Sequence, residues 1–168
     1  MGIQQIFLGV SGAISPYNQD EDWSSYGTSG TTGYPLDWAT DGDITTPTFT
    51  LCQIGVNTEW DFGSIFSSAT KVRFYAAYGG SAFTNALKID TTDVSSYITA
   101  TGYAGEWSGE ITVNGFTTIT SSRPANSQLV GIRAIEVDGV VLVDDPADNS
   151  FHLKFDNTSD LGEDSAGS

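Results

Sequence analysis

The segment from Val130 to Val143 constrains the fold of this chain more than any other. Two apolar runs flank the dipeptide Asp138-Gly139. Asp-Gly between such runs is the strongest short-range signal for a two-residue β-hairpin, because both turn residues must adopt positive φ angles. Such a turn pairs Val137 with Val140, Ile135 with Leu142, and Arg133 with Asp144. The chain therefore contains at least one antiparallel strand pair.

Strand signals recur along the rest of the chain, whereas no long stretch shows a helical period with capping residues. We expect strands near 4–10, 49–55, 57–62, 70–78, 85–90, 109–119, 129–137 and 140–144. In one of them Val72, Phe74 and Ala76 alternate with polar residues, which indicates a strand with one dry face. Asn114-Gly115 interrupts another, as a bulge or a tight turn. Many short strands separated by Gly, Ser and Thr turns predict an all-β fold, an antiparallel β-sandwich.

The hairpin also indicates where the main domain ends. Asp144-Asp145-Pro146 stops its second strand, and the chain is polar from there on. We therefore divide the chain into an N-terminal arm or first strand (1–10), a β-sandwich domain (11–145), and an acidic linker or tail that could begin a second module (146–168). Residues 11–35 are expected to form a long surface loop, or a loop that packs its aromatic residues down.

The charge of the chain limits its partners. Its 168 residues include 21 acidic and only 6 basic residues, giving a formal charge of −15. Such a surface repels phosphate backbones and anionic membranes, so neither nucleic acid nor a membrane is an expected partner. The apolar start of the chain has no basic segment and is too short to span a bilayer. The negative charge is instead consistent with high solubility, with cation binding, or with a basic partner surface.

Few residues suit catalysis. Cys52 and His152 are the single cysteine and histidine. Cys52 lies in an apolar run and is expected to be buried, so a Cys/His nucleophile is not expected. Glu106 and Glu110 could form the carboxylate pair of a glycan hydrolase, but both lie in a turn and read as solvated. We therefore expect no enzymatic activity.

A cation site is the first binding hypothesis. Glu136 shares one side of its strand with Val130, Ile132 and Ala134. A carboxylate on an apolar face is costly unless it is paired, binds a metal, or tilts into water at the strand end. The loop Asp41-Gly42-Asp43 gathers hard oxygens, and calcium takes about six to eight of them. Asp41, Asp43, a threonine at 45 or 46, and Glu136 are therefore a candidate calcium cage, although Asp-Gly-Asp is also ordinary turn chemistry.

Clustered aromatic residues are the second binding hypothesis. Rings with a flat apolar face and a polar tip suit sugar rings. The candidate ligand-binding residues, which lie near several aspartates in the sequence, are Trp23, Tyr26, Tyr34 and Trp38. Trp107 with Tyr103 is a further candidate pair. The alternative for each of these rings is packing in the core or under a loop.

Four short motifs follow one another along the chain: Trp38–Thr46, Glu59–Ser64, Lys71–Ala76 and the late strand Ile135-Glu136-Val137. Their order resembles that of the galactose-binding, discoidin-like jelly-roll family. This resemblance implies an eight-stranded β-sandwich of jelly-roll type. It also implies a structural calcium ion held by the first loop and a late glutamate, which correspond here to Asp41, Asp43, Thr46 and Glu136.

A narrower resemblance involves three segments, 1–9, 134–144 and 149–167. They are similar to segments of structural proteins in tailed bacteriophages, especially marine ones. This implies a non-catalytic virion protein, either a capsid decoration or knob subunit or a tail or fibre component. Assembled in the host cytoplasm, it would be a homo-oligomer in contact with other virion proteins.

The N-terminus and a second function follow from that resemblance. The apolar residues expected to dock such an arm onto the particle are Ile3, Ile6, Phe7 and Leu8, although the same segment also fits an ordinary first strand. The alternative function is a carbohydrate-binding module that attaches to a host surface glycan. The two functions are compatible, because a virion surface module can bind glycans.

Overall fold

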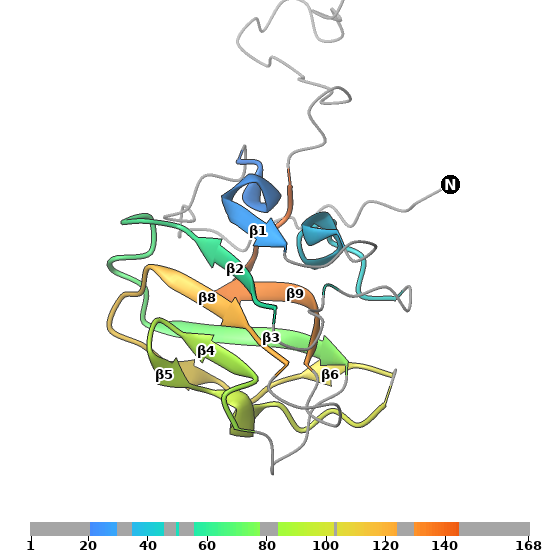
Figure 1. Cartoon of the computed structure of the whole chain (residues 1–168). Coiled ribbons are helices and arrows are strands. Elements are labelled where there is room, and N and C mark those ends of the chain that lie inside the picture. The colour runs from blue at the N-terminus through green and yellow to red at the C-terminus, as the bar shows by residue number, and fades with distance from the viewer. Residues whose placement is uncertain are drawn as a thin grey trace, which may run out of the picture.

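The computed structural model describes residues 21–29, 35–45, 50, 56–77, 84–102, 104–123 and 130–144. They form two antiparallel sheets that pack face to face (Figure 1). Sheet A contains, in spatial order, β1 (Gly27–Ser29), β2 (Thr58–Asp61), β8 (Thr118–Ser121), β4 (Leu87–Ile89) and β5 (Thr92–Asp93). Sheet B contains β10 (Val140–Val141), β9 (Gly131–Val137), β3 (Lys71–Ala77) and β6 (Glu106–Trp107), and β7 (Ile111–Thr112) also pairs with β3. The predicted all-β antiparallel sandwich is confirmed.

Helical structure in the described residues is restricted to three short 3₁₀ turns. These are η1 (Trp23–Tyr26), η2 (Leu36–Ala39) and η3 (Ser95–Tyr97). Among the described helices none is long and apolar enough to cross a membrane. The strands therefore provide the framework on which every candidate site is placed.

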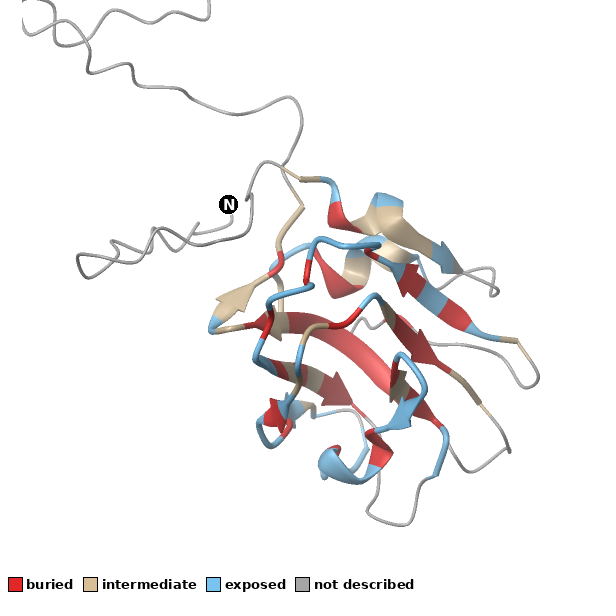
Figure 2. Ribbon diagram, turned by 90° about the vertical axis from the view of Figure 1, so that its left-hand side faces the viewer, coloured by how far each residue is buried: buried red, intermediate tan, exposed pale blue. Residues whose placement is uncertain are grey.

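The core lies between the sheets and is built on the long strands β3 and β9. Val72, Phe74 and Ala76 are buried, as their alternation with polar residues predicts. Nearly all of β9 is buried because this strand has neighbours on both sides. Figure 2 shows buried residues along the strands and exposed residues gathered at the turns. The apolar pattern of the sequence thus accounts for the two central strands.

The closing hairpin forms as predicted. Asp138 and Gly139 have φ angles of 49° and 85°, and Val137 pairs with Val140. The Leu142 N–H donates to the Ile135 carbonyl at 2.9 Å, which extends the pairing beyond β10. The two-residue turn and its register are confirmed.

The third expected pair of that hairpin, Arg133 with Asp144, is wrong. The ladder between β3 and β9 shifts register between Tyr75 and Ala76, so Arg133 sits at a bulge and is buried, and its guanidinium donates to the Ala104 carbonyl at 3.4 Å. Asp144 turns away from β9 and bonds to Thr40. A bulge re-aims a side chain, and the hairpin sequence alone gives no sign of it.

The remaining strand predictions have different outcomes. The segment 109–119 divides into β7 and β8 around Gly115, whose φ of +71° and close approach to the Ser67 backbone exclude a side chain. Strands β1, β5 and β6 were not predicted. Of the expected strand 49–55 only Thr50 is described, and it bridges Ile132 in antiparallel fashion. The segments 4–10, 1–10 and 146–168 lie outside the described residues.

Candidate functional site

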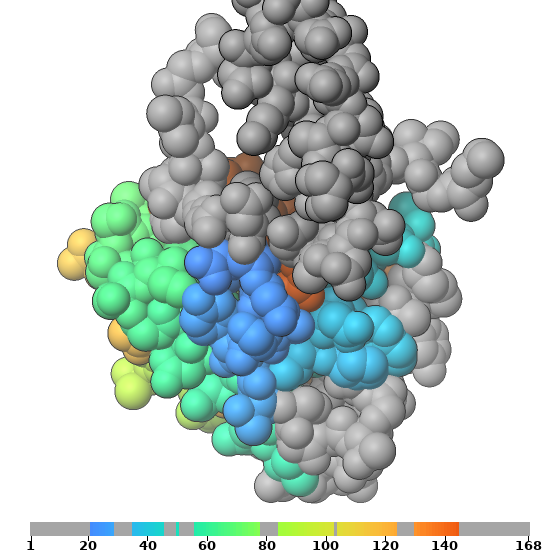
Figure 3. All heavy atoms as spheres, turned by 90° about the horizontal axis from the view of Figure 1, so that it is seen from above, coloured from blue at the N-terminus to red at the C-terminus, as the bar shows by residue number. Residues whose placement is uncertain are grey.

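One end of the sandwich carries a group of aspartates, which we call the acidic pole: Asp22, Asp37, Asp41, Asp43 and Asp144. Here η1 and η2 meet the end of the closing hairpin (Figure 3). The carboxylates of Asp37, Asp43 and Asp144 each act electrostatically on Asp41. The pole contains two of the four residues predicted to hold calcium.

Asp144 has a structural role at the pole. Its carboxylate accepts the Ser24 N–H at 2.9 Å and the Thr40 hydroxyl at 2.6 Å. Its own N–H donates to the Thr40 carbonyl at 2.7 Å. Burial, followed by the charge of Asp22, raises the pKa of Asp144 against the lowering effect of these hydrogen bonds. The residue therefore fastens the end of the hairpin to both η1 and η2.

The Asp41-Gly42-Asp43 loop is held by its own hydrogen bonds. An Asp41 carboxylate oxygen accepts the Asp43 N–H at 2.7 Å, and Asp43 accepts the N–H and hydroxyl of Thr45 at 2.7 and 2.6 Å. Gly42 adopts a φ of +74°. Burial, then the neighbouring carboxylates, raises the pKa of Asp41. These contacts are the ordinary turn chemistry that the sequence left as the alternative to a cation site.

The predicted calcium cage is not assembled around Glu136. The Glu136 carboxylate accepts from Arg73 Nε at 2.8 Å and from Arg73 Nη2 at 2.6 Å. Both oxygens therefore face a guanidinium. Among the described residues no group of three or more His, Cys, Asp or Glu side chains could hold a metal ion. Thr46 lies outside the described residues. The ion pair with Arg73 compensates for the partial burial of the Glu136 carboxylate.

The predicted aromatic cluster is largely a packing feature. Trp23 is 0% exposed and stacks on Phe66 with ring centroids 5.6 Å apart, so its assignment as a ligand-binding residue is wrong. Tyr26 is half-buried against Phe62 and donates its hydroxyl to Glu21 at 3.0 Å, a bond that raises the Tyr26 pKa. Trp38 is half-buried. Outside the described residues lie Tyr34, Tyr103, Ile3, Ile6, Phe7 and Leu8.

The outer face of sheet B brings together four residues, which we call the Trp107 cluster: Arg73, Tyr75, Trp107 and Glu136. Tyr75 pairs with Trp107 across β3 and β6, and their rings meet edge to face at 5.4 Å. The Arg73 guanidinium lies 5.0 Å from the centre of the Trp107 ring. Arg73 also pairs with Glu136 across β3 and β9. The pairing of β3 with both β6 and β9 thus brings these four residues together.

Sequence reasoning selected Trp107 and Glu136 separately and missed Arg73 and Tyr75. The available signal was the alternation along β3, which places both missed residues on the face opposite the core. Nothing in the sequence indicated that β6 would pair with β3 and bring Trp107 beside them. The hydrogen bond to Glu136 raises the pKa of Arg73, so this guanidinium stays charged.

The carboxylates proposed for hydrolysis are exposed and separately engaged. Glu106 accepts the Thr99 hydroxyl at 2.7 Å, and Glu110 pairs with Lys71 at 2.9 Å. Both side chains are exposed to solvent. These two residues therefore show no arrangement suited to glycoside hydrolysis.

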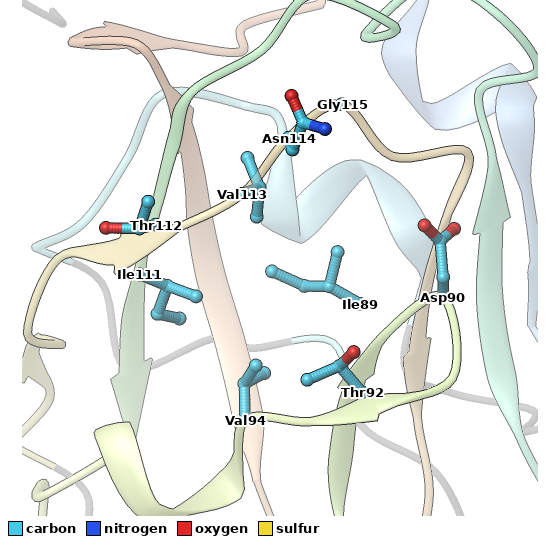
Figure 4. Close-up of a pocket in the computed structure, with 9 residues that line it drawn as sticks. All are labelled: Ile89, Asp90, Thr92, Val94, Ile111, Thr112, Val113, Asn114 and Gly115. Atoms are coloured by element: carbon cyan, nitrogen blue, oxygen red, sulfur yellow. The ribbon is translucent and has the colours of Figure 1, made fainter.

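A shallow hollow of about 210 Å³ opens between the edges of the two sheets, where β4 and β5 face β7. Its floor is apolar, and Ile89, Val94, Ile111 and Val113 converge on it (Figure 4). The only ionisable residue in its lining, Asp90, is already bonded to Thr117 and Thr118. The hollow is below the roughly 300–1,000 Å³ typical of ligand pockets and holds no convergent polar groups.

Comparison with family models, curated proteins and solved structures found no match to this chain.

Proposed function

We propose that this chain is a non-catalytic structural protein of a tailed-bacteriophage virion, either a capsid decoration or a component of the tail or fibre. Three segments of the sequence support the proposal by their resemblance to phage structural proteins. The antiparallel β-sandwich formed by the described residues agrees with such a structural role. Its partners are then other virion proteins and further copies of itself.

The observation that carries the proposal is the tether at the acidic pole. Asp144, at the end of the hairpin, bonds to Ser24 in η1 and to Thr40 beyond η2. The described domain is therefore entered and left at the same end, and β4 and β5 lie toward the opposite end (Figure 1). A domain joined to its flanking segments at one end can stand on a particle and leave its remaining surface free.

Quantitative mass spectrometry of purified particles of the source phage tests this function. The number of copies of the chain per virion is compared with those of the major capsid protein and the tail proteins. A ratio that follows the capsid protein identifies a head decoration, and one that follows the tail proteins identifies a tail or fibre part. Absence of the chain from the particles would overturn the proposal.

A further inference from the structure

We propose that the Trp107 cluster on sheet B is a binding site for uncharged hexose-type sugars. This site goes beyond the virion function and does not depend on it, because sugar binding is a property of the isolated chain. It also differs from the aromatic cluster that the sequence singled out, whose Trp23 is a core residue. The argument rests on the aromatic surface, the unused hydrogen-bonding groups and the balance of charge.

The cluster offers an aromatic surface on a rigid support. Trp107 and Tyr75 are half-buried rings on the paired strands β6 and β3. Arg73 lies against the indole ring and is fixed in place by its two bonds to Glu136. A site carried by paired strands and locked by second contacts keeps its geometry without a ligand. Aromatic rings with polar tips suit the apolar faces and hydroxyl groups of a pyranose.

Several polar groups of the cluster are not used by the described residues. Arg73 binds Glu136 through Nε and Nη2, and its Nη1 has no acceptor in the described part of the chain. The same holds for the Trp107 indole N–H and the Tyr75 hydroxyl. The Trp23 and Trp60 indole N–H groups are buried without a partner, whereas these two groups are not buried. Each Glu136 oxygen accepts one bond and has room for another. The cluster thus contains both donors and acceptors, as hydrogen bonding to sugar hydroxyls requires.

The charge of the cluster selects a neutral ligand. Arg73 is balanced by Glu136 at 2.6 Å, and the neighbouring Lys71 by Glu110 at 2.9 Å. These two pairs leave no net positive charge of their own for a carboxylate or sulfate, and the chain as a whole carries −15. Long-range repulsion therefore disfavours polyanionic glycans. Arg73 is 37% exposed and Glu136 only 12%, so the donor meets the ligand first.

A protein partner fits this face less well. Protein interfaces have a fully buried apolar centre, and charged residues are depleted there. The Trp107 cluster has two rings beside one ion pair, and the pair of Lys71 with Glu110 is nearby. The exposed large apolar residues in the described part of the chain, Ile65 and Tyr97, belong to other segments. A small polar ligand that uses both rings and charges matches the surface more closely.

Affinity electrophoresis of the whole chain tests the site. Native gels contain soluble dextran, galactan or mannan as neutral probes, or alginate as an anionic probe. We expect at least one neutral polymer to retard the wild-type chain and alginate not to. Trp107→Ala should weaken that retardation at least tenfold, Arg73→Ala should weaken it too, and Trp107→Phe should retain part of it. Trp38→Ala, which changes the same residue type elsewhere, should bind as the wild type does.

Thermal melting of each variant separates loss of the site from loss of the fold. The site is overturned if no neutral polymer retards the wild-type chain, or if Trp107→Ala stays retarded while folded. Retardation that Trp38→Ala abolishes and Trp107→Ala does not would move binding to the acidic pole. Retardation by alginate alone would contradict the neutral class. None of these results bears on the number of copies per virion, so the two proposals fail separately.

Discussion

The acidic pole with the adjacent Trp23, and the Trp107 cluster, both combine charged and aromatic residues, yet these residues make different contacts in the two places. At the pole, Asp144 and Asp43 accept bonds from nearby N–H and hydroxyl groups, and Trp23 is fully buried. In the cluster, the charges pair across strands and leave Arg73 Nη1 and the Trp107 indole N–H without described acceptors. Residues that stand out in a sequence can be fully engaged in contacts that hold the fold together. A binding surface needs polar groups that have no partner within the protein.

The largest expected contrast is between the two tryptophans. Trp23→Ala removes a fully buried ring that contacts Phe62 and Phe66, and should lower the free energy of unfolding by about 3–5 kcal/mol. Trp107→Ala removes a half-buried ring on the surface and should cost about 1 kcal/mol. Urea unfolding of both variants measures the difference. Equal losses would mean that Trp107 also serves mainly to hold the sandwich together.

A smaller loss is expected from the tether at the pole. Asp144→Ala leaves the Ser24 N–H and the Thr40 hydroxyl without their acceptor and should cost about 2 kcal/mol. Glu110→Gln breaks an exposed ion pair with Lys71 and should change stability by less than about 0.5 kcal/mol. Both values come from urea unfolding at pH 7. If the two variants lose the same amount, the pole does not fasten the hairpin.

The pole should also make the chain more stable in mild acid. Because the folded pKa values of Asp41 and Asp144 are raised above 3.8, the folded state binds more protons between 3.8 and those values. The free energy of unfolding should therefore rise as pH falls from 7 through this range. Asp90 and Asp93 have lowered pKa values because of their hydrogen bonds, so their contribution is lost as pH falls below 3.8.

Urea unfolding between pH 7 and pH 2.5 follows this pH dependence. The wild-type chain should show a maximum on the acid side of neutrality, and Asp144→Asn should flatten the rise toward it. Arg73 has a raised pKa and does not titrate in this range, so the Trp107 cluster contributes little to the profile. A stability that falls steadily from pH 7 would contradict the raised pKa values of Asp41 and Asp144 at the pole.

The smallest expected effect is that of calcium. Glu136 is held by Arg73 and not by the Asp41 loop, so a specific cage is not available among the described residues. Calcium should raise the melting temperature no more than magnesium does at equal concentration, through general screening of the negative charge. A rise that is specific to calcium and is lost in Glu136→Gln would restore the predicted cage.

Two hairpins show how far the sequence predicted the fold. In both, a turn aspartate with positive φ caps the start of a neighbouring strand: Asp138 bonds to Thr70 and Lys71, and Asp90 to Thr117 and Thr118. The first turn was predicted because Asp-Gly strongly favours a two-residue hairpin turn. The second turn, which joins β4 to β5, was missed because Asp-Thr has no such preference for a hairpin turn. The capping contacts join residues far apart in the sequence and leave no local signal.

The candidate site was predictable only in fragments. The alternation along β3 placed Arg73 and Tyr75 on an outer face, and Glu136 stood out against its apolar neighbours. Its partner was misassigned to the Asp41 loop, because the register between β3 and β9 that sets it opposite Arg73 is a tertiary property. The burial of Trp23 likewise depends on Phe62 and Phe66 from a distant segment. Local patterns predict on which face of a strand a residue lies, but the pairing between strands decides which residues become neighbours.

The indole N–H signals of the four tryptophans provide the most direct test of where this chain binds. In a nitrogen–proton correlation spectrum they report separately on Trp23, Trp38, Trp60 and Trp107. Titration with a neutral oligosaccharide of the polymer that retards the chain should shift the Trp107 signal and leave the buried Trp23 and Trp60 signals in place. A shift of Trp38 without a shift of Trp107 would contradict the account and place the binding surface at the acidic pole.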